Sequence, residues 1–388
     1  MKIKLVKSSF HNEKDTKARL IKFIEGASVM SMGRETEKFE RQFSKKQGRM
    51  FSLFVNSGSS ANLILLQALQ NQGVLKRGDK VGVSALTWAT NIMPVIQLGM
   101  EPIAIDCEVD TLNVSPRTLK KRIKEIDALF LTNVLGFSDD IRGIATLCKK
   151  NKIIFLEDKC ESLGSKAHGK LLGNFGLAST FSFFVGHHLS TLEGGMICTD
   201  DEDLYHHLIL ARAHGWDRNL PTLKQEEMRE KHGVDDFFSK YTFYDLAYNL
   251  RPTDIHGFLG HSQLKYWNDI VKSRERNFRT VHKAIVENPN LVNLRFDHMD
   301  IVSNFAVPVI GKDVKTFNLY RKRFENEGVE IRPIIAGDIT KQPFYKKYRT
   351  GKDDCPNAHL IHSQAFYFGN NPELTERELA FLAKLLQY

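Results

Sequence analysis

Short apolar runs alternate with amphipathic segments through the first two thirds of the chain, and this alternation limits the fold more than any other feature. Each run has the length and the β-branched or aromatic content of a buried strand, and most segments between the runs have helical periodicity. Strand–helix–strand alternation is typical of a mostly parallel sheet with helices on its faces. The sequence therefore predicts a large α/β domain over residues 1–254 with seven strands: FSLFV (51–55), KVGVS (80–84), EPIAID (101–106), ALFLT (128–132), IIFLE (153–157), TFSFF (180–184) and GMICT (195–199).

The pattern changes after residue 254. Residues 261–285 have the pattern of one long amphipathic helix with polar and basic residues on one face. A strand (304–310), a helix (313–328) and a strand (329–334) follow, and Thr375 with Glu378 forms the capping-box pair of a last helix. These elements predict a smaller α+β domain over residues 255–388, packed on the first.

Charge, hydropathy and cysteine usage exclude several classes of protein. The 55 Lys+Arg and 46 Asp+Glu leave a net charge of +9, but the basic residues are spread among acids, so nucleic-acid binding is not expected. No stretch is apolar for the roughly 18 residues of a membrane span, and the basic start lacks the apolar core of a secretory signal. Five scattered cysteines predict a cytoplasmic protein with neither a disulfide framework nor a cysteine-based metal site: Cys107, Cys148, Cys160, Cys198 and Cys355.

Two motifs place polar groups where α/β sheets bind ligands. The stretch Asn56–Asn62 (NSGSSAN) follows a strand and opens a helix, so its small residues let backbone N–H groups approach an anion; an ordinary N-cap is the alternative. Asp158 follows the run IIFLE, at the carboxyl end of a parallel strand. Its carboxylate suits a protonated ring nitrogen, although an acid here also caps turns.

Aromatic and imidazole rings follow two other strands. Trp88 comes directly after a strand among polar residues, where an indole stacks on a planar ligand or simply packs in the core. His187 and His188 lie on a glycine-flanked turn five and six residues after Ser182. A metal pair is not expected, because adjacent side chains point apart and no further ligand stands at the required spacing. A structural histidine is the alternative for either ring.

The order and spacing of these motifs are more specific than any one of them. Over nearly its whole length the chain resembles the fold-type I, pyridoxal-phosphate-dependent sugar aminotransferases that act on nucleotide-linked ketosugars. The resemblance rests on residues 33–40, 58–61, 87–88, 157–164, 182–195, 248–254 and 328–333. It implies the fold of that family, an active homodimer, and sites shared between its subunits.

One departure from the family decides the activity that the resemblance implies. The family's Schiff-base lysine lies five residues after the motif serine and six before Glu-Gly-Gly; both counts lead to His187, and no lysine occurs between Lys170 and Lys224. This pattern is similar to that of the sugar 3-dehydratases of the same fold. Their CDP-linked branch adds a two-iron cluster held by closely spaced cysteines, so the scattered cysteines here favour the metal-free GDP-linked branch.

The resemblance also implies a cofactor, pyridoxal 5′-phosphate cycling with pyridoxamine 5′-phosphate, and residues that hold it. Gly58, Ser59 and Ser182 are expected to bind its phosphate, Trp88 to stack on its ring and Asp158 to keep its ring nitrogen protonated. Three further roles are implied. Glu161, where aminotransferases usually have Gln or His, also binds the cofactor; Asn249 reaches the phosphate from the partner subunit; and His187 is the catalytic base.

The implied reaction removes the C3 hydroxyl of GDP-4-keto-6-deoxy-D-mannose and releases ammonia, with L-glutamate restoring the cofactor amine, as in the synthesis of colitose for lipopolysaccharide O-antigens. The resemblance assigns substrate binding to Ser28, Val29, Met30, Ser31, His188, His214, Arg218, Arg251 and Glu330. Three alternatives stay open: an aminotransferase that uses a lysine elsewhere, a CDP-linked dehydratase, and a non-catalytic binding protein.

Overall fold

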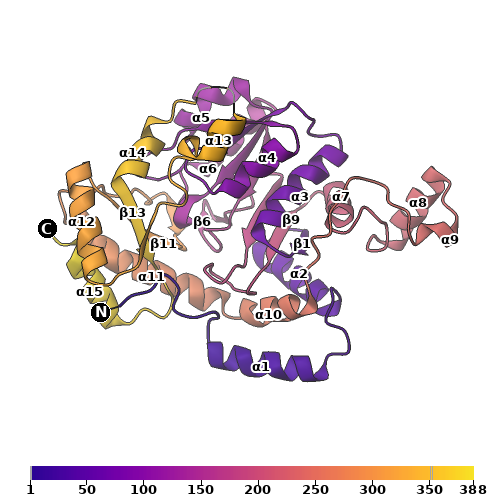
Figure 1. Ribbon diagram of the computed structural model, residues 1–388, viewed down its shortest axis with the longest axis horizontal. Helices are drawn as coiled ribbons and strands as arrows, with labels where there is room; N and C mark the ends of the chain where they lie inside the picture. Colours follow the sequence, from indigo (N-terminus) through magenta and orange to yellow (C-terminus); the bar gives the residue numbers. More distant parts are fainter. Residues whose placement is uncertain (1, 350, 352) are drawn as a thin grey trace.

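A seven-stranded sheet forms the centre of the large domain and confirms the predicted α/β class (Figure 1). The computed structural model describes residues 2–349, 351 and 353–388. The strand order is β1-β9-β8-β5-β4-β2-β3, and only β9 runs against the others. Each predicted run forms a strand: β1 Phe51–Val55, β2 Lys80–Ser84, β3 Glu101–Ile105, β4 Ala128–Thr132, β5 Ile154–Asp158, β8 Ala178–Ser182 and β9 Gly195–Thr199.

Helices cover this sheet and extend from it on one side. The helices up to residue 239 are α1 Glu13–Gly26, α2 Arg34–Gln47, α3 Gly58–Asn71, α4 Met93–Gln97, α5 Pro116–Arg122, α6 Ile141–Lys150, α7 Glu202–Arg212, α8 Thr222–His232 and α9 Asp236–Ser239. Figure 1 shows α8 and α9 standing out beyond α7, at the far right. A short hairpin, β6 Lys166–Ala167 and β7 Lys170–Leu171, pairs with β10 Met299–Ile301.

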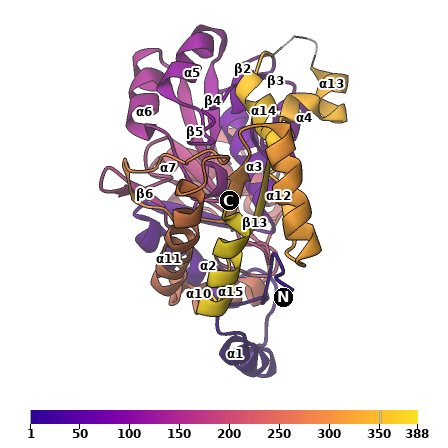
Figure 2. The ribbon, with the colours of Figure 1, turned by 90° about the vertical axis from the view of Figure 1, so that its left-hand side faces the viewer.

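The C-terminal part contains a second, antiparallel sheet, β11-β13-β12, with β11 Ala306–Ile310, β12 Ile331–Pro333 and β13 Ala365–Gly369. Around it lie α12 Val314–Asn326, α13 Pro343–Tyr348, α14 Pro356–Gln364 and α15 Glu376–Leu386; Figure 2 shows α12, α15 and β13 from their own side. Thr375 and Glu378 form the predicted capping box of α15. The boundary at 254/255 stays a prediction. Helix α10 (Asp254–Leu264) packs on α2, whereas helix α11 (Trp267–Val286) packs on α15.

The long helix predicted over residues 261–285 is two helices. Helix α10 spans Asp254–Leu264, and α11 begins at Trp267 and ends at Val286. The turn between them presents the Tyr266 hydroxyl to the side chains of Asp15 and Asn12 on the N-terminal segment. Periodicity continues across this turn, so it could not reveal the break.

A cluster of phenylalanines supports the carboxyl end of β8, which carries Ser182. Phe39 and Phe43 of α2 meet Phe54 of β1 and Phe181 and Phe183 at the end of β8, and each ring is at most 1% exposed. Ring centroids lie 5.0 Å apart for Phe39–Phe54 and 5.1 Å for Phe43–Phe181, both edge-on. Such pairs add about 0.5–1.5 kcal/mol each beyond the area they bury. The cluster therefore holds the end of β8 rigidly.

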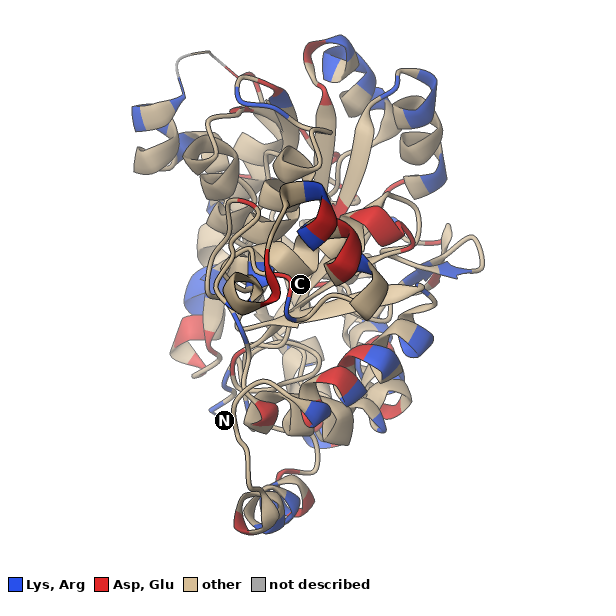
Figure 3. Ribbon diagram, turned by 90° about the vertical axis from the view of Figure 1, so that its right-hand side faces the viewer, with Lys and Arg blue, Asp and Glu red and all other residues tan. Residues whose placement is uncertain are grey.

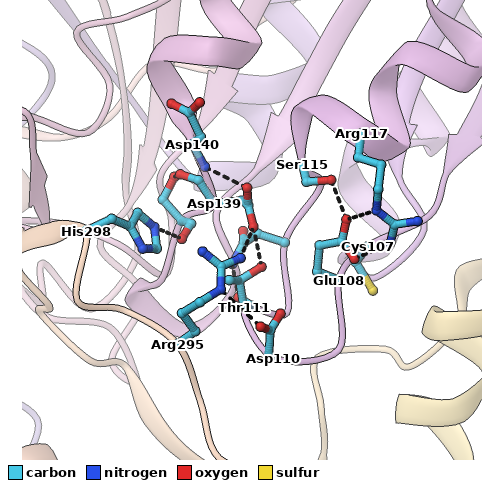
Figure 4. A network of polar contacts seen from close by, with 12 residues as sticks. Cys107, Glu108, Asp110, Thr111, Ser115, Arg117, Asp139, Asp140, Arg295 and His298 are labelled. Carbon is cyan, nitrogen blue, oxygen red and sulfur yellow. Dashed lines mark hydrogen bonds and ion pairs between the residues drawn. The ribbon is translucent and has the colours of Figure 1, made fainter.

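A polar network ties the segment after α11 to the loops of the large sheet (Figure 4). The Arg295 guanidinium contacts Asp110 at 3.0 Å and Asp139 at 3.1 Å, and its backbone N–H donates to the Asp110 carbonyl. The His298 ring contacts the Ser138 carbonyl at 2.9 Å. These contacts fix the approach of the small domain to the large one.

The surface has no single basic face in the view of Figure 3, where Lys and Arg alternate with Asp and Glu along most helices. Among the described residues, no helix is both long and apolar enough to cross a membrane.

Candidate active site

A cavity of about 400 Å³ lies at the carboxyl ends of the parallel strands, between the large sheet and the small domain. Its walls come from the β1–α3 turn, from the ends of β4, β5 and β8, and from β11 and β13. The residues predicted to hold the cofactor from this subunit all line it, together with the predicted base: Gly58, Ser59, Trp88, Asp158, Glu161, Ser182 and His187. Folding therefore brings together residues that are spread over more than 120 positions of the sequence.

The N-terminus of α3 forms one end of this cavity. Ser57 caps the helix by accepting a hydrogen bond from the Ser60 N–H. Gly58 packs so closely on β8 that an added Cβ would lie 2.6 Å from the Ser182 Cβ and 3.0 Å from its Oγ. The backbone and the Ser182 hydroxyl therefore form a tight cradle at the positive end of a helix, which suits a phosphate.

Asp158 is the last residue of β5, and its carboxylate is held from two sides. Oδ1 accepts from the Cys160 N–H at 2.8 Å, and Oδ2 accepts from Asn62 Nδ2 at 3.1 Å. Asn62 is fully buried on α3, four residues after Gly58. The sequence analysis gave Asn62 no role, although it belongs to the motif that opens α3. Its position one helical turn after Gly58 was the signal that could have pointed to its place in the site.

The Trp88 ring is 57% exposed and lines the cavity, which contradicts the alternative of plain core packing. The buried Thr87 beside it pairs hydroxyls with Thr132 of β4 at 2.6 Å, and so fixes the start of this loop. An exposed indole in the wall of this cavity is free to cover a planar ring.

The two histidines point in different directions. The His187 ring lines the cavity, and its Nδ1 has no hydrogen-bond partner among the described residues. Burial, assisted by the nearby Arg274 guanidinium, lowers the pKa of His187 to about 4, so the ring is neutral at pH 7. The His188 ring turns away: its Nε2 contacts the Ser303 carbonyl at 2.9 Å, and it lines a smaller cavity behind His187.

No lysine is among the residues that line the large cavity in the described part of the chain. Lys159 follows Asp158 directly but is fully buried elsewhere, where its ammonium contacts Asn133 and lies 3.2 Å from Glu157. Successive strand residues face opposite ways, which keeps this amine out of the cavity.

Glu161 enters the same cavity as a carboxylic acid. Burial raises its pKa to about 8, against the hydrogen bond that its Oε2 accepts from the Leu135 N–H at 2.9 Å. A neutral carboxyl can donate a hydrogen bond, as the amide of a glutamine would.

The remaining predicted residues lie outside the lining of this cavity. Asn249 accepts from Arg251 Nε at 3.0 Å, and the Arg218 guanidinium lies 4.1 Å from the centre of the Trp216 ring, which His214 also contacts. Ser31 pairs with Thr253 at the end of the stretch 28–31, and Glu330 accepts from the Leu5 N–H. Their contacts thus lie outside the cavity, except that Leu5, the partner of Glu330, lines it.

Comparisons with known proteins match the chain over nearly its whole length. The model of the DegT/DnrJ/EryC1/StrS aminotransferase family matches residues 11–387. GDP-4-keto-6-deoxy-D-mannose 3-dehydratase of Yersinia pseudotuberculosis is 33% identical over 372 residues, covering 94% of this chain and 93% of that protein. The E. coli GDP-4-keto-6-deoxy-D-mannose-3-dehydratase with bound hydrated PLP superposes with a TM-score of 0.91 at 30% identity, over 100% of both chains. A GDP-4-keto-6-deoxymannose-3-dehydratase with a trapped PLP-glutamate geminal diamine matches equally well, with a TM-score of 0.91 and 30% identity, over 99% of this chain and 100% of that one.

Proposed function

This chain belongs to the DegT/DnrJ/EryC1/StrS aminotransferase family, and from that premise we propose that it is a pyridoxal-phosphate-dependent hydro-lyase acting on GDP-4-keto-6-deoxy-D-mannose. The reaction removes the C3 hydroxyl and yields a GDP-4-keto-3,6-dideoxy sugar and ammonia. One observation carries the proposal: among the residues that the structure describes, an imidazole and no lysine faces the cavity in which the coenzyme would bind.

The cavity fits the coenzyme. Gly58, Ser59 and the Ser182 hydroxyl would hold the phosphate, since the close approach of Gly58 to β8 leaves room for no side chain there. Asp158 would hold the proton of the ring nitrogen, and Trp88 would cover the ring. When bound, pyridoxamine phosphate supplies an amine for the sugar's 4-keto carbon and a ring that accepts electrons.

His187 supplies the proton transfers. Its neutral imidazole accepts a proton and, as imidazolium, delivers that proton to the C3 hydroxyl, which departs as water. A primary amine at this position would tether the coenzyme and exchange nitrogen with the sugar, whereas an imidazole cannot. The sugar therefore loses oxygen and gains no nitrogen, and L-glutamate must give up its amine, leaving as 2-oxoglutarate, before each turnover.

The proposal includes a homodimer with shared sites. Asn249, Arg218, Arg251 and the segment 28–31 lie outside the cavity of their own subunit, so they would complete the partner's. Mixing inactive His187→Asn and Arg218→Ala dimers tests this arrangement. Heterodimers then have one intact site each, and about a quarter of wild-type activity should return. No recovery after subunit exchange would place Arg218 in its own subunit's site.

The test of the reaction itself is product analysis with nucleotide-linked 4-ketosugars and L-glutamate. Ammonia and a 3-deoxy product are expected from the GDP-linked mannose sugar; a preference for the CDP-linked glucose sugar would assign the chain to the other dehydratase branch. An aminosugar, or a lasting mass gain of the coenzyme after borohydride, would show an aminotransferase. Release of no product from any sugar would favour a binding protein. The five free thiols suit a reducing compartment, so we place the reaction in the cytoplasm.

A further inference from the structure

The charges that line the large cavity are mostly negative. Asp158 and Glu193 contribute carboxylates from the large domain, whereas burial raises the pKa of Glu161 to about 8 and leaves that carboxyl mostly neutral at pH 7. Arg274, on α11, is the one arginine among the described residues of the lining, which contains no lysine. An anionic group that enters this cavity from solvent therefore finds a single guanidinium contributed by the same subunit.

The Arg274 guanidinium is hydrogen-bonded on one side and has no partner among the described residues on the other. All its hydrogen bonds leave from Nη1, which donates to the carbonyl oxygens of Phe305 at 2.8 Å, Asn370 at 2.6 Å and Asn304 at 3.4 Å. Nε is buried and has no partner among the described residues, although the side chain is only 4% exposed. A buried donor without a partner is rare, because it loses its hydrogen bonds to water and gains none.

The unpaired side of the guanidinium has the donor pattern that binds a carboxylate. Nε and Nη2 form one of the edges to which a carboxylate binds with two parallel hydrogen bonds. The backbone carbonyls fix the plane of the group through Nη1, so little side-chain freedom is left to lose on binding. No carboxylate of the described residues lies within salt-bridge distance: Glu373, which shares the smaller cavity with Arg274, is held by the Ser8 hydroxyl at 3.0 Å.

Arg274 also lies close to the predicted base. It lines both the large cavity and the smaller one behind His187, and His187 lines both as well. A donor amine that reaches the coenzyme next to His187 carries its α-carboxylate one carbon away. Burial lowers the pKa of Arg274 to about 10, which still leaves the guanidinium charged at pH 7.

We infer that the Nε edge of Arg274 binds the α-carboxylate of the amino-acid donor. This inference rests on the proposed function, in which L-glutamate restores the coenzyme amine. Arg274 thereby selects amino acids over simple amines as sources of the amine. Binding of the amino acid also gives the buried Nε–H group the hydrogen-bond partner that it lacks. The alternative is a purely structural arginine that joins α11 to the ends of β11 and β13.

The experiment compares Arg274→Gln and Arg274→Lys with Arg276→Gln, a matched control on the exposed face of the same helix. Calorimetry of the holoenzyme with glutarate, an unreactive dicarboxylate, measures carboxylate binding directly. We expect Kd to rise about 100-fold in Arg274→Gln, the effect of losing one or two charge-assisted hydrogen bonds. Arg276→Gln should bind glutarate like the wild type.

Separate half-reactions test the role in turnover. Conversion of the coenzyme by L-glutamate should slow in Arg274→Gln at least tenfold more than single-turnover dehydration by enzyme preloaded with pyridoxamine phosphate. Equal losses in the two halves, or unchanged glutarate binding, would overturn the inference. Should Arg274→Gln fail to fold, Arg274→Lys decides by the same glutarate titration. Wild-type enzyme that binds glutarate through Arg274 but dehydrates no sugar would sink the proposed function alone.

Discussion

Substituting Gly58 by alanine tests whether the start of α3 and the end of β8 form the phosphate site. The added methyl would lie 2.6 Å from the Ser182 Cβ and 3.2 Å from its Cα. Ordinary carbon–carbon contacts are about 3.5–4.0 Å, so the helix and the strand must separate by roughly 1 Å. The phenylalanine cluster beneath β8 resists that movement, because Phe181 and Phe183 are closely packed.

Two opposing effects set the magnitude for stability. Overpacking of this kind costs about 1–3 kcal/mol, while alanine in a helix is favoured over glycine by about 0.5–1 kcal/mol. The coenzyme-free protein should therefore lose about 1–2 kcal/mol, measured by urea unfolding. Cofactor affinity should fall more. The phosphate loses one charge-assisted hydrogen bond, and the loss of about 1.5–3 kcal/mol of binding free energy raises Kd about 10–100-fold.

The assay is a titration of coenzyme-free enzyme with pyridoxal phosphate, followed by absorbance. Ser182→Ala removes the hydroxyl without pushing the strand and should weaken binding by a similar factor. Gly26→Ala, at the open end of α1 with no atom near the new methyl, is the matched control; it should leave coenzyme affinity unchanged and raise stability by at most about 0.5–1 kcal/mol. A Gly58→Ala protein that is destabilised as expected but binds the coenzyme normally would refute the phosphate assignment.

Three further outcomes follow from the site. His187→Asn should slow dehydration about 10²–10⁴-fold, the usual contribution of a general base, while a coenzyme titration shows unchanged binding; full activity would move the base elsewhere. Burial lowers the pKa of His187 to about 4, so at pH 5.5 about 97% of this imidazole is neutral, against about 10% for an ordinary histidine. Single-turnover rates at pH 5.5 and 7.5 should therefore agree within about twofold. A tenfold lower rate at pH 5.5 would show that the pKa of His187 is unperturbed. Phe39→Ala should cost about 3–5 kcal/mol in urea unfolding, since its ring is fully buried among four others; a loss below about 1 kcal/mol would mean that the cluster repacks.

Local spacing alone located much of the candidate site. The strand runs, the helix start at Gly58 and the strand-end Asp158 each follow from patterns within about ten residues, and each lies in the structure where the pattern predicted it. Counting along the chain from Ser182 was enough to put a histidine where the resembling family carries lysine. Such signals are readable because strand and helix periods fix which side chains share a face.

Contacts between distant segments decided the rest. Asn62 meets Asp158 across 96 positions, and Arg274 meets Asn370 across 96 as well, so no local pattern announces either pair. The same holds for which of two adjacent histidines faces the cavity, and for the break between α10 and α11 at Tyr266. Chain-local rules specify elements and faces, but which buried donor finds which acceptor depends on how whole layers pack, because an unmet polar group costs free energy only once the layers around it exclude water.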